Sequence, residues 1–118
     1  RFELRLMDGS SNPYLLQAGI IAAGLHGLNN KIDPGEPLYC NMYTDYKNYP
    51  NLKKLPDEIQ DALDFLEDCK ELKEAFGQNT ISSYIKLKRL EIKNFNQKEN
   101  FNKKDSVTVW EKDNTLDC

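Results

Sequence analysis

Histidine and cysteine, the usual ligands of transition metals, are scarce in this sequence of 118 residues. It contains one histidine, His26, and three cysteines, Cys40, Cys69 and Cys118, which lie far apart in the chain. Because no Cys-x-x-Cys pair occurs, the sequence supports neither a zinc site nor a disulfide framework. An odd number of cysteines without such a framework fits a reducing compartment, and we expect the protein to be cytoplasmic.

An excess of basic residues is also lacking. The 16 lysines and arginines are interspersed with 19 aspartates and glutamates, and the net charge is −3. A nucleic-acid-binding face normally concentrates positive charge. A tyrosine cluster in residues 39–49 could stack on bases, but the acidic balance argues against this, and we expect no nucleic-acid partner.

No hydrophobic run is long and uniform enough to predict a membrane span. Residues 14–28 are apolar nearly all the way round a helix, but they are rich in glycine and interrupted by Gln17 and His26. We therefore expect no membrane contact and predict a buried helix over residues 12–30, with Asn12 as its N-cap. His26 on such a helix is more often a satisfied core or interface residue than a catalyst.

The sequence has no initiator methionine, charged leader or signal peptide, and it begins inside a strand-like pattern. We expect further residues before Arg1. The chain is then the carboxy-terminal piece of a longer protein and contributes at most one domain.

Residues 1–8 are predicted to form a β-strand. Polar and apolar side chains alternate, which places Arg1, Glu3 and Arg5 on one face. Neighbours on that face lie roughly 6.6 Å apart, a spacing that lets two guanidinium groups bind different oxygens of one phosphate-bearing ligand. Taken alone, such a pattern is most often a solvated sheet face with cross-strand ion pairs. Both interpretations stay open at this point.

The rest of the chain divides into a loop and a helical tail. Proline and glycine punctuation predicts a long loop over residues 31–55, and apolar periodicity predicts helices in residues 56–118. One helix begins at residue 56, a short one ends at Gly77, and a third begins near residue 79. The basic residues of the third helix are expected to form its solvated face: Lys86, Lys88, Arg89 and Lys93. Residues 94–105 are predicted to be a linker, and residues 106–116 fit either a strand or a helix.

Three sequence motifs resemble one family. The run Arg1 to Asp8, the Asn12-Pro13-Tyr14 step, and the stretch from Ala22 to Glu36 are similar to the carboxy-terminal part of the glutamine synthetase catalytic domain. Met7 departs from the family pattern, which usually has proline there. The tail ending at Cys118 resembles that of the bacterial type III, or GlnT-like, subgroup.

This resemblance implies an α+β fold class, in which one N-terminal β-strand is followed by mostly α-helices. It also implies an ATP-dependent ligase that makes glutamine from glutamate and ammonia through γ-glutamyl phosphate. Arg1 then matches the residue that contacts the ATP phosphates, and Glu3 matches a ligand of Mg²⁺ or Mn²⁺. Arg5 matches the catalytic arginine that holds glutamate and the transferring phosphoryl group.

In this family the active site forms between adjacent subunits of a homo-oligomeric ring, of the hexamer or dodecamer type. The resemblance therefore implies that residues 1–118 alone are inactive and expose an apolar helix face. Two alternatives stay open: a γ-glutamylamide synthetase that uses methylamine or a polyamine, and a noncatalytic module that only helps to assemble rings. Tyr43 stands near the sequence position at which some type I enzymes carry a tyrosine that receives an AMP group. Here we expect Tyr43 to be an exposed loop residue.

Overall fold

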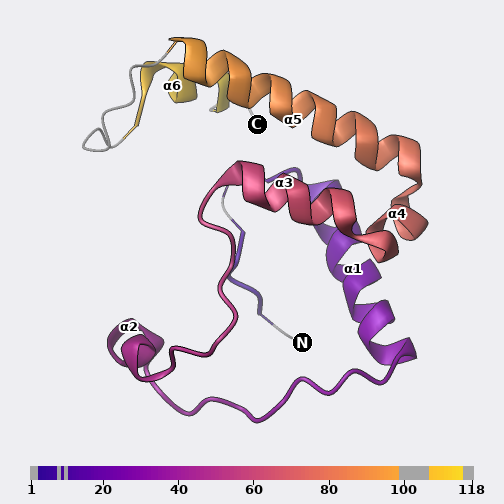
Figure 1. The fold of residues 1–118 in the computed structure, drawn as a ribbon, viewed down its shortest axis with the longest axis vertical. Helices are drawn as coiled ribbons and strands as arrows, with labels where there is room; N and C mark the ends of the chain where they lie inside the picture. Colours follow the sequence, from indigo (N-terminus) through magenta and orange to yellow (C-terminus); the bar gives the residue numbers. More distant parts are fainter. Residues whose placement is uncertain (1–2, 8, 10, 99–106, 116–118) are drawn as a thin grey trace.

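The computed structural model describes residues 3–7, 9, 11–98 and 107–115, and its regular elements are all helical. Figure 1 shows α1, α3, α4 and α5 gathered on one side, while the short helix α2 lies apart from them at the end of an extended connection. The overall dimensions are 45 × 40 × 26 Å.

The predicted N-terminal strand is not seen. Residues 3–7 have no regular secondary structure, and residues 1, 2 and 8 lie outside the described part of the chain. A strand is stabilised when its backbone N–H and C=O groups pair with a neighbouring strand. The described residues provide no strand for such pairing, so the alternating sequence pattern is not sufficient to form one.

Helix α1, Pro13–Asn29, confirms the helix predicted over residues 12–30. The Asn12 side chain accepts hydrogen bonds from the N–H groups of Tyr14 and Leu15, both at 3.0 Å, and Pro13 occupies the first turn. The prediction that this helix is buried is wrong for this chain, because none of its residues is buried. Helix α4 packs against it but leaves Ile21 and Leu28 exposed.

The predicted loop over residues 31–55 contains two short helices, α2 (Met42–Asp45) and the 3₁₀ helix η1 (Tyr46–Asn48). Asn41 caps α2: its side chain accepts from the N–H of Tyr43 at 3.1 Å, while its own N–H donates to Asp45 at 3.2 Å. This reciprocal arrangement stabilises one helical turn inside a segment that proline and glycine otherwise keep irregular.

The small core lies between α3 (Ile59–Asp68) and α5 (Gln78–Lys98). Its buried residues are Leu63, Ile81 and Ile85. Helix α3 begins three residues later than the predicted start at 56. Helix α4 (Lys70–Phe76) joins the two and ends at Gly77, whose φ of 84° explains the glycine there.

Helix α5 extends through residues 94–98, so the predicted linker is wrong over those five residues. Residues 109–115 form helix α6 (Val109–Thr115), which decides the open choice between strand and helix. The ring of Trp110 in α6 meets the ring of Phe95 in α5 edge to face, with centroids 5.5 Å apart. This contact packs α6 against the end of α5 and favours the longer helix.

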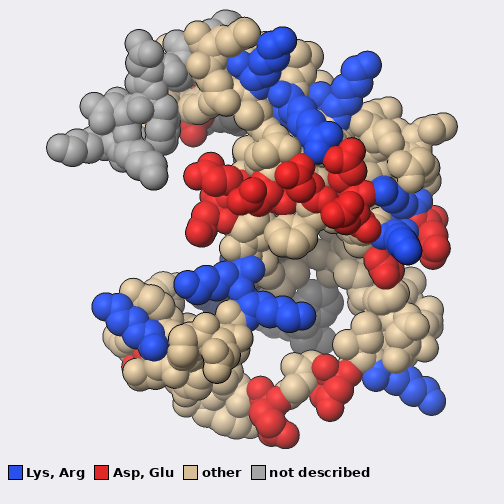
Figure 2. Space-filling model, viewed as in Figure 1, with Lys and Arg blue, Asp and Glu red and all other residues tan. Residues whose placement is uncertain are grey.

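The expectation of a solvated basic face on α5 holds for Lys86 and Lys93, which are exposed, but Lys88 and Arg89 are half-buried and form ion pairs. Figure 2 shows the acidic side chains of α3 beside the basic side chains of α5. Arg89 of α5 reaches across to α3, with N···O distances of 2.9 Å to Asp64 and 2.6 Å to Glu67. The periodicity of α5 could not predict this ion pair, because the pattern of one helix does not show which helix packs beside it.

Candidate functional site

The candidate site is the segment before α1, where the structure brings together Glu3 and Arg5. The Nε of Arg5 donates a hydrogen bond to Oε1 of Glu3, so the two side chains form an ion pair. Both remain open to solvent, with side-chain exposures of 82% for Arg5 and 68% for Glu3. Arg1, the third predicted site residue, lies outside the described residues.

Leu4, which lies between Glu3 and Arg5 in the sequence, has a different environment. Leu4 lines a hollow of about 620 Å³ on α1, together with residues that include Leu15, Gly19 and Ala23. The alternation predicted from the sequence is kept only in part: Leu4 lines this hollow but is 41% exposed, and Leu6 is 62% exposed.

Glu3 provides a carboxylate, which is the hard oxygen ligand that Mg²⁺ and Mn²⁺ prefer. Among the described residues, no group of three or more His, Cys, Asp and Glu side chains could hold a metal ion. Glu3 therefore offers one oxygen ligand, and the other described residues do not complete a metal site around it.

A second hollow, of about 260 Å³, lies between α1, α4 and α5. Its volume falls below the range of roughly 300–1,000 Å³ that is typical of ligand pockets. Its lining is largely apolar and includes Leu16, Leu72, Phe76 and Ile81. These features describe an incompletely filled packing space between helices.

The other residues considered from the sequence have local roles. His26 is half-buried, and its Nδ1 lies 3.2 Å from the side-chain nitrogen of Asn30, as expected for a satisfied histidine. Tyr43 is 92% exposed on α2, as expected for a loop residue. Cys40 lies 3.5 Å from the sulfur of Met42, and its hydrogen bond with Tyr49 raises the pKa of that tyrosine.

Residues 1–106 match the sequence model of the glutamine synthetase catalytic domain. The chain belongs to the glutamine synthetase family. Glutamine synthetases of Rhizobium leguminosarum bv. phaseoli and Rhizobium meliloti are 43% and 44% identical to it over 117 residues, which is 99% of this chain and 25% of each relative. The glutamate–methylamine ligase of Methyloversatilis universalis is 38% identical over 95 residues, or 77% of this chain and 21% of that protein.

The chain spans about a quarter of the length of its Rhizobium relatives. In the comparison with solved structures, none matched it. None of the helices in the described ranges is long and apolar enough to cross a membrane. The family match covers both Glu3 and Arg5, so it includes the segment identified above as the candidate site.

Proposed function

We propose that the full-length protein is a glutamine synthetase that uses ATP to join ammonia to glutamate. The observation that carries this proposal is the Glu3–Arg5 pair, held open to solvent in a chain that belongs to this ligase family. In the proposed reaction, the γ-phosphoryl group of ATP passes to the side-chain carboxylate of glutamate. Ammonia then attacks the γ-carbonyl carbon and loses a proton, and phosphate leaves.

Each candidate residue has a role that suits its chemistry. Arg1 binds the ATP phosphates, and Glu3 supplies one oxygen ligand to Mg²⁺ or Mn²⁺. Arg5 holds the glutamate carboxylate and the transferring phosphoryl group, where its guanidinium offsets the negative charge that spreads over the phosphoryl oxygens. When bound, the metal ion supplies further charge neutralisation at those oxygens.

The complete site requires partners that this chain does not contain. We propose that the full-length protein forms a homo-oligomeric ring, of the hexamer or dodecamer type, in which the site lies between adjacent subunits. The exposed apolar surface of α1, including Ile21, Leu25 and Leu28, supports this because such side chains are stable when another part of the assembly covers them. The free thiols of Cys40 and Cys69 fit a cytoplasmic location.

We further assign the protein to the bacterial type III, or GlnT-like, subgroup. The support for this assignment is the resemblance of the tail that ends at Cys118 to the tails of that subgroup. Enzymes of known subgroup provide the test. The assignment predicts that type III tails align through Cys118 and that type I tails do not.

The proposed activity is tested with the purified full-length enzyme, ATP, glutamate, ammonia and either Mg²⁺ or Mn²⁺. We expect equal amounts of glutamine, ADP and phosphate, and no turnover when the divalent ion is removed with a chelator. Replacing ammonia with hydroxylamine is expected to yield the γ-glutamyl hydroxamate, because hydroxylamine attacks the same acyl phosphate. ATP hydrolysis without any glutamyl product would contradict the proposal.

A second candidate is a γ-glutamylamide synthetase that accepts methylamine or a polyamine. The identity to a glutamate–methylamine ligase favours keeping this candidate, because Glu3 and Arg5 serve the shared acyl-phosphate step whichever amine attacks. Competition between ammonia, methylamine and putrescine at equal concentrations separates the two. A larger kcat/KM for methylamine or putrescine than for ammonia would show that the product is the corresponding γ-glutamylamide and not glutamine.

A noncatalytic ring-assembly role is disfavoured because both Glu3 and Arg5 are retained.

A further inference from the structure

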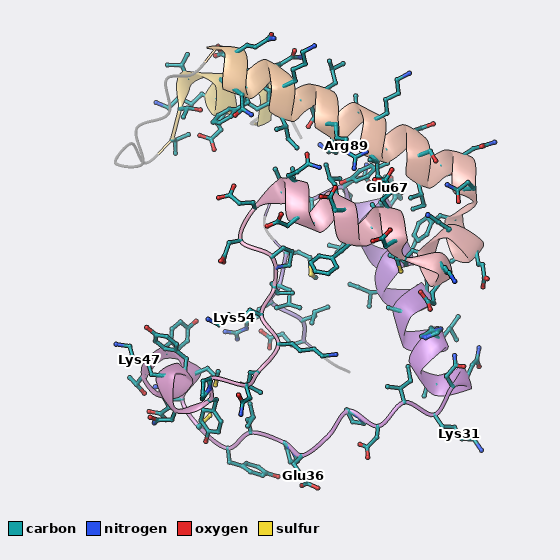
Figure 3. The ribbon with its side chains drawn as sticks, in the orientation of Figure 1. Lys31, Glu36, Lys47, Lys54, Glu67 and Arg89 are labelled. Atoms are coloured by element: carbon teal, nitrogen blue, oxygen red, sulfur yellow. The ribbon has the colours of Figure 1, made fainter. Side chains whose placement is uncertain are left out.

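Helix α1 ends in a strained turn. The N–H of Ile32 donates to the C=O of Gly27 at 2.9 Å, and the N–H of Lys31 donates to the C=O of Leu28 at 3.2 Å. In a helix cap of this kind, the residue at the position of Lys31 is left-handed and is usually glycine. Lys31 has a φ of 51°, which is unfavourable for a residue that carries a Cβ. Figure 3 shows Lys31 where α1 meets the connection toward α2, so this turn sets the direction of that connection.

The side chain of Asn30 holds the turn together. Its amide nitrogen donates to the C=O of His26 at 2.9 Å and lies 3.2 Å from Nδ1 of the same residue. A donor at this position fits a neutral imidazole, which accepts at Nδ1 and carries its proton on Nε2. In a protonated imidazole both nitrogens are donors, so Nδ1 no longer accepts. Turning the Asn30 amide over does not restore the contact, because its oxygen then faces the carbonyl oxygen of His26.

Helix α4 carries the charge that a protonated His26 meets. This helix packs against α1, and its Glu71 interacts electrostatically with His26. Hydrogen bonds from its own N–H and from the Cys69 thiol lower the pKa of Glu71, and the nearby Lys70 lowers it further, so the carboxylate is ionised at neutral pH. Attraction to Glu71 therefore draws an imidazolium toward α4. The other charged side chain at this end of α1 is Lys31, which is exposed and has the same sign as an imidazolium.

We propose that His26 and Asn30 form a proton-operated latch on the turn that ends α1. With neutral His26 the latch is closed, and Lys31 is held in its strained conformation. When His26 is protonated, Nδ1 releases the Asn30 amide, the ring moves toward Glu71, and the turn opens. Because histidine side chains ordinarily titrate near pH 6.5, the connection toward α2 is fixed above that range and loosens below it. This inference does not depend on the proposed function.

The latch is tested by hydrogen exchange of the full-length protein, with mass spectrometry of peptides that contain residues 30–32. Protection is measured relative to the intrinsic exchange rate at about pH 5.5 and about pH 8, on either side of the histidine range. The wild type is expected to lose roughly fivefold of its protection at the lower pH, which is the effect of losing one hydrogen bond.

Four variants separate the parts of the latch. His26→Asn places an amide oxygen near the position of Nδ1 and cannot be protonated, so its protection should be the same at both pH values. Asn30→Ala removes the amide, so protection should be low at both. Glu71→Gln removes the charge that attracts the imidazolium and should move the loss to lower pH. Asp61→Asn removes an exposed carboxylate on α3 and should leave the loss in place.

Equal wild-type protection at the two pH values would overturn the latch. A loss in His26→Asn as large as in the wild type would also overturn it, because another group would then be titrating. If His26→Asn does not fold, as judged by circular dichroism, a wild-type loss that persists in Asn30→Ala overturns the latch instead. Equal shifts in Glu71→Gln and Asp61→Asn would overturn the attraction to α4.

Discussion

At the scale of single residues, Arg89 connects two helices through charge. Its guanidinium lies between Asp64 and Glu67 of α3, and Figure 3 shows the Arg89 and Glu67 side chains directed toward one another. The hydrogen bond from Arg89 lowers the pKa of Glu67, and the same contact raises the pKa of Arg89. The ionised forms of both residues are therefore favoured when α3 and α5 are packed together.

This pair predicts a pH dependence of stability. Because the pKa of Glu67 is lower in the folded chain than in the unfolded chain, its stabilising contribution is present above the unfolded pKa and is lost as the pH falls through the folded value. We expect the protection of amides in α3 and α5, measured relative to the intrinsic exchange rate at each pH, to fall below about pH 4. Arg89→Gln should reduce this acid sensitivity, whereas Lys93→Gln should keep it. An unchanged pH profile in Arg89→Gln would contradict the assignment.

Leu63 is predicted to contribute more to stability than any exposed residue of α3, because it is 4% exposed and lies in the core with Ile81 and Ile85. Leu63→Ala should lower the free energy of unfolding by about 2 kcal/mol, since it removes buried methyl groups and leaves a cavity. Phe65→Ala is the matched control on the same helix, because Phe65 is 70% exposed. Chemical denaturation measures both, and an equal effect of the two substitutions would show that the core lies elsewhere.

At the scale of elements, local signals in the sequence predicted helices well where the capping chemistry is local. Asn12 begins α1 and Gly77 ends α4, as their residue types indicate. The alternation around Glu3 did not yield a strand, because strand formation depends on a neighbouring strand that the sequence pattern cannot supply.

Long-range contacts explain the other differences between expectation and structure. Residues 94–98 look like a linker because they are rich in asparagine and lysine, yet α5 continues through them where Trp110 packs on Phe95. Arg89 looked solvated because its acidic partners lie 22 and 25 positions earlier in the chain. Of the candidate site, the sequence indicated that Glu3 and Arg5 share a side, but it could not show that they contact each other.

The N-terminal cap of helix α6 is predicted to contribute to the stability of that helix. Thr108 accepts a hydrogen bond from the N–H of Glu111 at 3.1 Å, and Glu111 accepts from the N–H of Thr108 at 2.7 Å. The Glu111 carboxylate also accepts from the Thr108 hydroxyl at 2.8 Å, and the bonds that it accepts from the N–H and the hydroxyl of Thr108 lower the pKa of Glu111. Thr108→Ala should destabilise α6 by about 1 kcal/mol, while Thr108→Ser, which keeps the hydroxyl, should retain most of the stability. Hydrogen exchange of the α6 amides measures this, and equal exchange in both variants would contradict the capping role.

At the scale of the whole molecule, the described part of the chain has few buried residues and much exposed apolar surface. The buried hydrophobic core contains Leu63, Ile81 and Ile85, whereas Ile21 and Leu28 of α1 are 61% and 76% exposed. Figure 1 shows α1 extending away from α3 and α5 toward the connection that leads to α2. Such a surface is typical of an element that packs inside a larger assembly.

The isolated 118-residue chain is therefore predicted to have no ligase activity and to bind hydrophobic dyes. It carries Glu3 and Arg5 but, within its described residues, no complete metal-ligand set, so it cannot hold the reacting groups. Dye fluorescence and light scattering should show exposed apolar surface and self-association, both of which Leu25→Gln together with Leu28→Gln should reduce. ATP-dependent glutamine formation by the isolated chain would contradict this prediction.

The most direct measurement of the central claim is steady-state glutamine formation by the full-length enzyme and its site variants. If Glu3 binds the metal and Arg5 stabilises the transferring phosphoryl group, Glu3→Gln and Arg5→Gln should each lower kcat by about 10²-fold or more. Lys93→Gln should keep wild-type turnover, because this residue lies on an exposed face of α5. Wild-type kcat in Glu3→Gln or Arg5→Gln would show that the reaction does not depend on this pair and would contradict the account.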